Sequence, residues 1–211
     1  MTQQIPWPNV KRPLVAILRG VKPDEVEGIV EVLIDTGFEM IEVPLNSPDP
    51  FDSIARICKR FGRDTLIGAG TVLTADDCAR VADVGGRLMV SPNVDVDVLA
   101  MARSRGMVTM PGVFSPTEAF LALRHGASAL KFFPASILGP AGIAAIRAVL
   151  PKDAVIGAVG GVSDRNFADY IKAGITAFGL GSSLYKPGMS AGEVKATAQA
   201  AVTAYDRAIV G

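Results

Sequence analysis

Eight short apolar runs alternate along the chain with helical patterns of about a dozen residues, and this alternation constrains the fold more than any other feature. The runs lack the in-out polar alternation of a half-solvated sheet, as expected for strands that are buried on both faces. Such alternation is typical of βα units around a parallel sheet. The runs cover residues 14–20, 40–46, 65–72, 88–93, 107–113, 129–134, 154–162 and 177–184.

The spacing of the runs predicts the architecture. Consecutive runs end roughly 20 to 28 residues apart, which leaves no room for a second domain or a long linker. We therefore expect residues 1–211 to form a single (β/α)8 TIM barrel of the α/β class, with residues 1–13 as an N-terminal extension. An open doubly wound sheet is the alternative, but the first run continues as LRGVKP and carries no GxGxxG fingerprint.

Local signals mark where several helices begin and end. Ser115 to Glu118 and Ser190 to Glu193 both read as S-x-x-E capping boxes. The first helical pattern places its apolar residues on one stripe, and Gly37 follows it as a stop signal. The stripe consists of Val26, Ile29, Val30, Leu33 and Ile34.

Composition and charge exclude several classes of function. The 21 Lys and Arg residues balance 21 Asp and Glu residues, and no basic stripe is present, so nucleic acid is not an expected partner. The longest uncharged stretch, 132–146, is broken by Pro134 and Pro140, so no membrane-spanning helix is expected. The N-terminal residues do not resemble a signal peptide, which favours a cytoplasmic protein. Cys58 and Cys78 are expected to be buried free thiols.

The eight runs contain only three charged residues, Arg19, Glu42 and Lys131. Charge is costly in a buried strand, and each of these residues lies at or near the C-terminal end of its run, where barrel enzymes collect their chemistry. They are therefore candidate catalytic residues. The alternative interpretation is a structural ion cluster, with Arg19 extending into solvent.

Lys131 indicates covalent chemistry. It lies between Leu130 and Phe132, and such surroundings favour the neutral amine, as does a neighbouring Arg19. A neutral lysine can attack a ketone to form a Schiff base, which needs no metal and no cofactor. The single histidine, His125, precedes Gly126 and is expected to cap a helix. One histidine and two scattered cysteines do not make a zinc site, so we expect no metal.

Glu42 and Arg19 indicate the other functions that such a site needs. Glu42 lies in IEVP, where apolar surroundings raise the pKa of a carboxylate towards the range of a general acid/base. The guanidinium of Arg19 has the geometry to bind a carboxylate, with the hydroxyl of Thr71 as a second group. A substrate that carries a carboxylate is therefore predicted.

The last two runs carry a candidate phosphate site. Glycines there allow backbone N–H groups to approach an anion, and a helix beginning near Ser163 would add its dipole. The loops after strands seven and eight are common phosphate sites in barrels. Tight turns with small residues are the alternative reading. The candidate residues are Gly160, Gly161, Gly181 and Ser182.

Taken together, these residues resemble a known family, the class I aldolases that cleave 2-keto-3-deoxy-6-phospho sugar acids to pyruvate. The resemblance runs from Leu14 to about Tyr185. It implies a TIM barrel, a homotrimer, Lys131 as the Schiff-base lysine and Glu42 as the acid/base. The motifs that carry it are IEVPLN (41–46), GAGTV (68–72), SPN (91–93), MPG (110–112), LKFFP (130–134), VGG (159–161) and GLGS (179–182).

Two branches of this family act on keto acids that differ at C4, derived from 6-phosphogluconate or 6-phosphogalactonate. Asn46 and Val159 depart from the gluconate pattern, which has Arg and Thr there, and Arg19 fits the galactonate pattern. Loss of the threonine hydroxyl removes a partner for one C4 epimer. We therefore favour the galactonate branch, with galactonate catabolism as its context. The gluconate branch is the alternative, and a phosphosugar isomerase or epimerase and a noncatalytic binding barrel are rivals of other classes.

Overall fold

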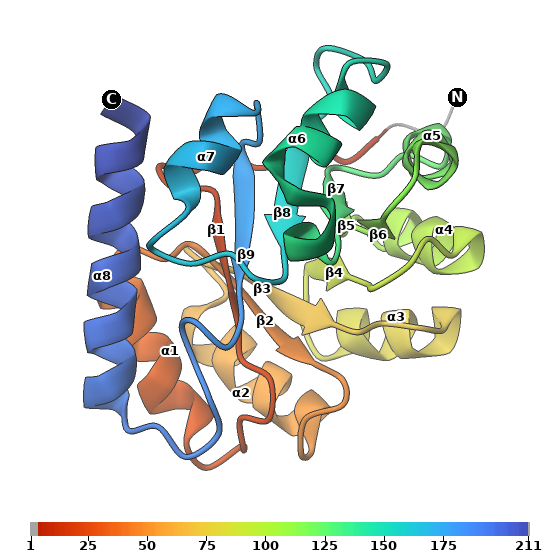
Figure 1. The fold of residues 1–211 in the computed structure, drawn as a ribbon. Coiled ribbons are helices and arrows are strands. Elements are labelled where there is room, and N and C mark those ends of the chain that lie inside the picture. The colour runs from red at the N-terminus through yellow and green to blue at the C-terminus, as the bar shows by residue number, and fades with distance from the viewer. Residues whose placement is uncertain (1–3, 211) are drawn as a thin grey trace.

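The apolar runs form the strands of a parallel barrel in the computed structural model, which describes residues 4–210 (Figure 1). Every pair of neighbouring strands is parallel, in the order β5-β4-β3-β2-β1-β9-β8-β7-β6, which confirms the predicted TIM barrel. The strands are β1 (Leu14–Ile17), β2 (Met40–Pro44), β3 (Leu66–Gly70), β4 (Leu88–Val90), β5 (Val108–Met110), β6 (Gly112–Val113), β7 (Leu130–Phe132), β8 (Ile156–Val159) and β9 (Ala177–Leu180).

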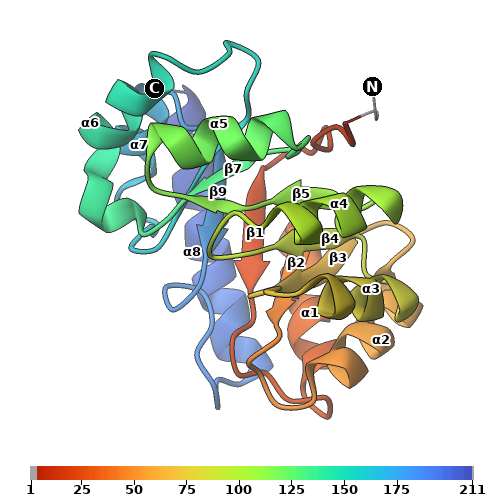
Figure 2. The same ribbon diagram turned by 90° about the vertical axis from the view of Figure 1, so that its right-hand side faces the viewer.

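Helices surround the barrel, with α8 beside α1 on its outer surface (Figures 1 and 2). They are α1 (Val26–Asp35), α2 (Pro50–Phe61), α3 (Ala75–Asp83), α4 (Val96–Ser104), α5 (Pro116–Arg124), α6 (Ala135–Arg147), α7 (Phe167–Lys172) and α8 (Ala191–Val210). Within residues 4–210, no helix is both long and apolar enough to cross a membrane.

The predicted run 107–113 forms two strands rather than one, because Pro111 separates β5 from β6 and has no N–H for the ladder. The connection to β7 nevertheless continues. The Ala129 amide donates to Thr109 O at 3.0 Å, and the Lys131 amide donates to Pro111 O at 2.9 Å. The two short strands therefore occupy one position in the barrel and close it.

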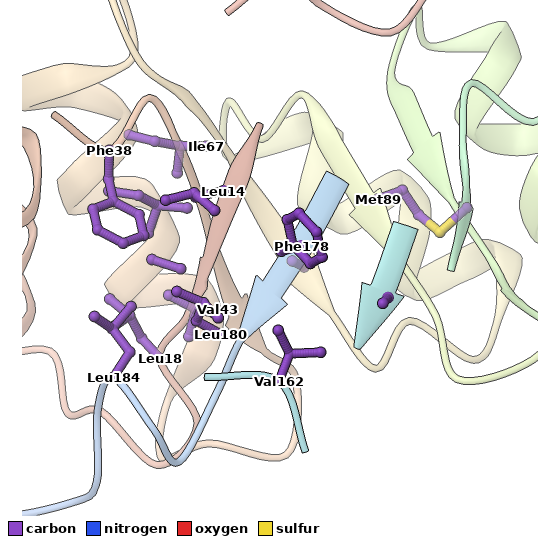
Figure 3. Packing of buried hydrophobic residues seen from close by; sticks show 14 of the residues in the cluster. Leu14, Leu18, Phe38, Val43, Ile67, Met89, Val162, Phe178, Leu180 and Leu184 are labelled. Atoms are coloured by element: carbon purple, nitrogen blue, oxygen red, sulfur yellow. The ribbon is translucent and has the colours of Figure 1, made fainter. Parts of the chain in front are cut away.

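The core has two layers, one between the strands and the helices and one inside the barrel. Leu14, Phe38 and Phe178 belong to the outer layer (Figure 3). Along β2, Ile41 and Val43 also lie in the outer layer, whereas Met40 lies inside. Since side chains alternate along a strand, Glu42 points into the barrel.

The predicted helix ends are mostly confirmed. Ser115 and Glu118 form a reciprocal capping box, and Ser190 and Glu193 exchange equivalent hydrogen bonds at the start of α8. Gly37 follows α1 with a φ of +97°, which a glycine adopts at little cost. In the predicted stripe of α1, Val26, Ile29, Val30 and Leu33 are buried, and Ile34 is half-buried.

The prediction for the cysteines is partly wrong. Both thiols are free and Cys78 is buried, but Cys58 is only half-buried because it lies near the end of the amphipathic helix α2. Burial raises the pKa of each thiol to about 11, which keeps both in the unreactive thiol form at neutral pH.

The segment before β1 closes the N-terminal end of the barrel. Trp7 and Val10 pack against the inner layer, and the hydroxyl of Ser128 donates to Ile5 O at 2.6 Å. Arg12 forms a bidentate ion pair with Asp206 of α8, with both N···O distances at 2.7 Å. Of the predicted N-terminal extension 1–13, residues 1–3 lie outside the described residues.

Candidate active site

A cavity of about 440 Å³ opens at the C-terminal ends of the strands. It is lined by nearly all of the residues predicted from the sequence. Asn46 is the exception, because it is not part of the lining, although it accepts a hydrogen bond from Arg19. The predicted residues in the lining are Arg19, Glu42, Thr71, Lys131, Val159, Gly160, Gly161, Gly181 and Ser182.

Lys131 is buried in the middle of β7, with 7% of its surface exposed. Burial lowers its pKa to about 8, Glu42 acts in the opposite direction, and Arg19 lowers the pKa further. The Nζ atom lies 4.7 Å from the centre of the Phe133 ring. A substantial fraction of this side chain is therefore neutral near pH 8 and available as a nucleophile.

Glu42 is the second buried charged group of the cavity, with 2% of its surface exposed. Burial raises its pKa to about 7, although the charges of Lys131 and Arg19 and a hydrogen bond from the Gly70 amide favour the ionised form. Its Oε2 atom has no hydrogen-bond partner in the described chain. The carboxyl group can therefore both accept and donate a proton close to neutral pH.

Glycines inside the barrel make room for the side chains of Glu42 and Met110. A Cβ at Gly70 would lie 2.1 Å from Glu42 Oε2, and a Cβ at Gly157 would lie 2.1 Å from the methyl carbon of Met110. Gly157 is also the register partner of Lys131. The sequence reasoning missed this role of Gly70, although the alternation Gly68-Ala69-Gly70 was a signal that one face of β3 lacks side chains.

Arg19 and Thr71 meet at the opening of the cavity. Arg19 Nη2 donates to Thr71 Oγ1 at 3.4 Å, and Arg19 Nη1 donates to Asn46 Oδ1. Thr71 has a φ of +55°, a conformation that is strained for a β-branched residue. The turn after β3 thus turns the hydroxyl of Thr71 towards the guanidinium of Arg19.

Backbone amides also line the cavity. Gly160 and Gly161 have φ values of +91° and +80°, and their carbonyls accept hydrogen bonds from the Ser136 amide and the Asn166 side chain. Among the backbone hydrogen bonds of residues 4–210 outside the helices and strands, none has the amide of Gly160, Gly161 or Ser182 as its donor. Free N–H groups that line a cavity are suited to binding an anion.

The prediction that a helix begins near Ser163 and adds its dipole to the phosphate site is wrong. Helix α7 begins at Phe167 rather than near Ser163, because residues 164–166 form a separate turn. The Ser163 amide donates to Asn166 Oδ1 at 2.9 Å and is therefore not free for a ligand.

The comparisons with known proteins agree on one family. The family model described as KDPG and KHG aldolase matches residues 9–204. The chain belongs to the KDPG and KHG aldolase family. It is therefore an enzyme, an aldehyde-lyase of the aldolase type.

This aldolase has close relatives among curated proteins and solved structures. It is 65% identical over 203 residues, 96% of each chain, to a "Probable 2-dehydro-3-deoxy-6-phosphogalactonate aldolase" of Rhizobium meliloti. It is 47% identical to the "2-dehydro-3-deoxy-6-phosphogalactonate aldolase" of Escherichia coli, covering 95% of this chain and 98% of that one. A solved structure named "Native KDPGal structure" matches with a TM-score of 0.95 and 46% identity, over 98% of this chain and 100% of that one.

The cavity of the aldolase also contains residues that the sequence reasoning missed. Arg165 and Lys186 line it, as do Ser163 and Ser183. The two cations lie in loops, and one-dimensional patterns do not indicate which loop side chains point into a cavity. The positions of Gly160 and Gly181, a few residues earlier in the same loops, were the available signal.

The side chains that could bind a metal ion are not clustered in the described part of the chain. Among residues 4–210, no group of three or more His, Cys, Asp or Glu side chains is arranged to hold a metal ion. His125 is the C-cap of α5, as the sequence predicted, and does not line the cavity.

Proposed function

We propose that this aldolase cleaves 2-dehydro-3-deoxy-6-phosphogalactonate to pyruvate and glyceraldehyde 3-phosphate through a Schiff base on Lys131. The observation that carries the proposal is the pairing of two buried ionisable groups, Lys131 and Glu42, in one cavity. Burial brings their pKa values to about 8 and about 7. The names of the 65% and 47% identical relatives support the galactonate substrate.

The reaction begins with the neutral amine of Lys131. Its lone pair attacks the C2 ketone to form a carbinolamine, which loses water to give a protonated imine. Burial of Lys131 favours this step because the unprotonated amine is the reacting form. The positive imine then draws electrons from the C3–C4 bond.

Glu42 moves the protons in the following steps. As a carboxylate it removes the proton of the C4 hydroxyl, directly or through a water. The C3–C4 bond then breaks, glyceraldehyde 3-phosphate leaves, and the bonding electrons form an enamine on Lys131. The protonated Glu42 returns a proton to C3, and hydrolysis of the imine releases pyruvate and the free lysine. A pKa of about 7 suits both roles.

The other residues of the cavity bind the substrate. Arg19, held by Asn46 and accompanied by Thr71, is assigned the carboxylate. The amides of Gly160, Gly161, Gly181 and Ser182 are assigned the phosphate. Val159, which lines the cavity, presents a methyl surface instead of a hydroxyl and is assigned to the choice of C4 epimer.

Borohydride reduction in the presence of pyruvate tests the covalent step. We expect a reduced pyruvate adduct on Lys131 by peptide mass mapping, and neither an adduct nor measurable turnover in Lys131→Ala. Turnover of the two C4 epimers, followed by pyruvate release, tests the branch, and we expect higher kcat/KM for the galactonate epimer. Preference for the gluconate epimer would support the alternative branch. Lack of an adduct would refute the Schiff base on Lys131.

The assembly and the location of the protein are further parts of the proposal. The family resemblance implies a homotrimer, and exposed apolar side chains of Leu73, Val96 and Phe114, which follow strands β3, β4 and β6, would suit contacts between subunits. Light scattering should give three times the chain mass of 22.0 kDa. A cytoplasmic location fits the predicted substrate and is tested by cell fractionation.

A further inference from the structure

Two cations of the cavity have no role in the mechanism above. Arg165 and Lys186 line the cavity together with the glycines assigned to the phosphate. Both side chains are exposed, and neither forms an ion pair or a side-chain hydrogen bond with another residue of the range 4–210. Charged side chains that have no partner and lie at the edge of a cavity are available to a ligand.

The backbone at Lys186 is held firmly in place. The Tyr185 amide donates to Gly181 O at 2.9 Å, so the chain makes one helical turn directly after β9. The ring of Tyr185 is buried, and its hydroxyl donates to Glu25 Oε1 at 3.0 Å. Lys186 directly follows this anchored residue and lines the cavity together with Gly181 and Ser182.

Arg165 follows the other pair of glycines in a similar way. The side chain of Asn166 stabilises the turn, since it donates to Gly161 O at 2.9 Å and accepts from the Ser163 amide at 2.9 Å. The Arg165 amide donates to Ser163 Oγ at 3.3 Å. Lys186 and Arg165 therefore each follow a hydrogen-bonded turn whose glycines line the cavity.

The charges of the cavity match those of a phosphorylated sugar acid. Such a substrate carries one carboxylate charge and a phosphate charge of about −1.5 to −2 at pH 7. Arg19 balances the carboxylate, and two further full charges are needed at the other end of the molecule. Backbone amides supply only partial charges, so the glycines alone leave the phosphate undercompensated.

We propose that Lys186 and Arg165 bind the terminal phosphate and select phosphorylated keto acids over unphosphorylated ones. The inference rests on the proposed function and adds to it the groups that recognise the phosphate charge. An ammonium and a guanidinium donate charge-assisted hydrogen bonds to phosphate oxygens, which are stronger than those from neutral amides.

The test uses Lys186→Gln, Arg165→Gln and the double variant of the full-length enzyme. Lys172→Gln and Arg124→Gln are matched controls, because both residues are exposed and neither lines the cavity. For each protein we would measure kcat/KM with 2-dehydro-3-deoxygalactonate, with and without its 6-phosphate. A third assay follows exchange of the pyruvate methyl protons with deuterated water, a reaction that needs Lys131 and Glu42 but no phosphate.

We expect kcat/KM for the phosphorylated substrate to fall about 10-fold in each single variant and about 100-fold in the double variant. The unphosphorylated substrate and the pyruvate exchange should keep their wild-type rates. A double variant that still prefers the phosphorylated substrate as strongly as the wild type would overturn the inference. Failure of the wild-type enzyme to exchange pyruvate protons would instead overturn the proposed function.

Discussion

Replacing Gly70 with alanine tests how closely the barrel interior is fitted to Glu42. The new Cβ would lie 2.1 Å from Oε2, 2.3 Å from Oε1 and 2.4 Å from Cδ of Glu42. Real Cβ contacts are essentially never shorter than 3.0 Å, so the carboxyl group must retreat by about 1 Å or the strands must separate. The Gly70 φ is not positive, so the backbone itself can accept alanine.

The size of the effect follows from that displacement. A shift of about 1 Å in a group that acts on the substrate costs about 100-fold in rate, or about 2.7 kcal/mol of transition-state stabilisation. Overpacking of this kind costs a further 1–3 kcal/mol or so of the free energy of unfolding. The effect on the rate should fall on the steps that use Glu42, because the three atoms nearest to the new methyl group all belong to that side chain.

The assay separates the two steps by measuring pyruvate release and borohydride trapping on the same protein. Gly70→Ala should release pyruvate about 100-fold more slowly and still be trapped on Lys131. Gly28→Ala is the matched control, because a Cβ at Gly28 in α1 meets nothing within 4 Å. Gly28→Ala should keep full activity, and its free energy of unfolding should be higher than that of the wild type by up to about 1 kcal/mol. Wild-type pyruvate release by a folded Gly70→Ala protein would refute this account of Glu42.

Three further predictions concern pH and stability. The value of kcat/KM should rise as the pH passes from 6 through the pKa values of about 7 for Glu42 and about 8 for Lys131, because the ionised carboxylate and the neutral amine are the active forms. Since burial raises the Glu42 pKa from 4.5, stability should fall as the pH rises from 4.5 to 7, and Glu42→Gln should abolish that fall in urea titrations. Asp206→Asn should lower the free energy of unfolding by about 1 kcal/mol, because it breaks a bidentate pair with the largely buried Arg12. Asp52→Asn, which breaks a half-exposed pair on α2, should change the free energy of unfolding much less, and equal effects of the two variants would contradict the reasoning.

Most of the candidate catalytic residues could be predicted from the sequence, because charged residues are rare in buried strands. Arg19, Glu42 and Lys131 stood out for that reason, and the cavity contains all three. The site glycines could be predicted only in part. Gly160 and Gly161 were visible as a pair after a strand, whereas Gly70 depends on a side chain from the neighbouring strand.

The sequence by itself determined the order of strands and helices, the capping boxes at Ser115 and Ser190, and the three charged residues. These features depend on local periodicity and on residues three or four positions apart, which a linear reading can detect. The tertiary structure decided the rest: the division of the fifth run at Pro111, the late start of α7, and the entry of Arg165 and Lys186 into the cavity. Each of these depends on packing and hydrogen bonds between segments distant in sequence, whose relative positions exist only once the barrel has closed.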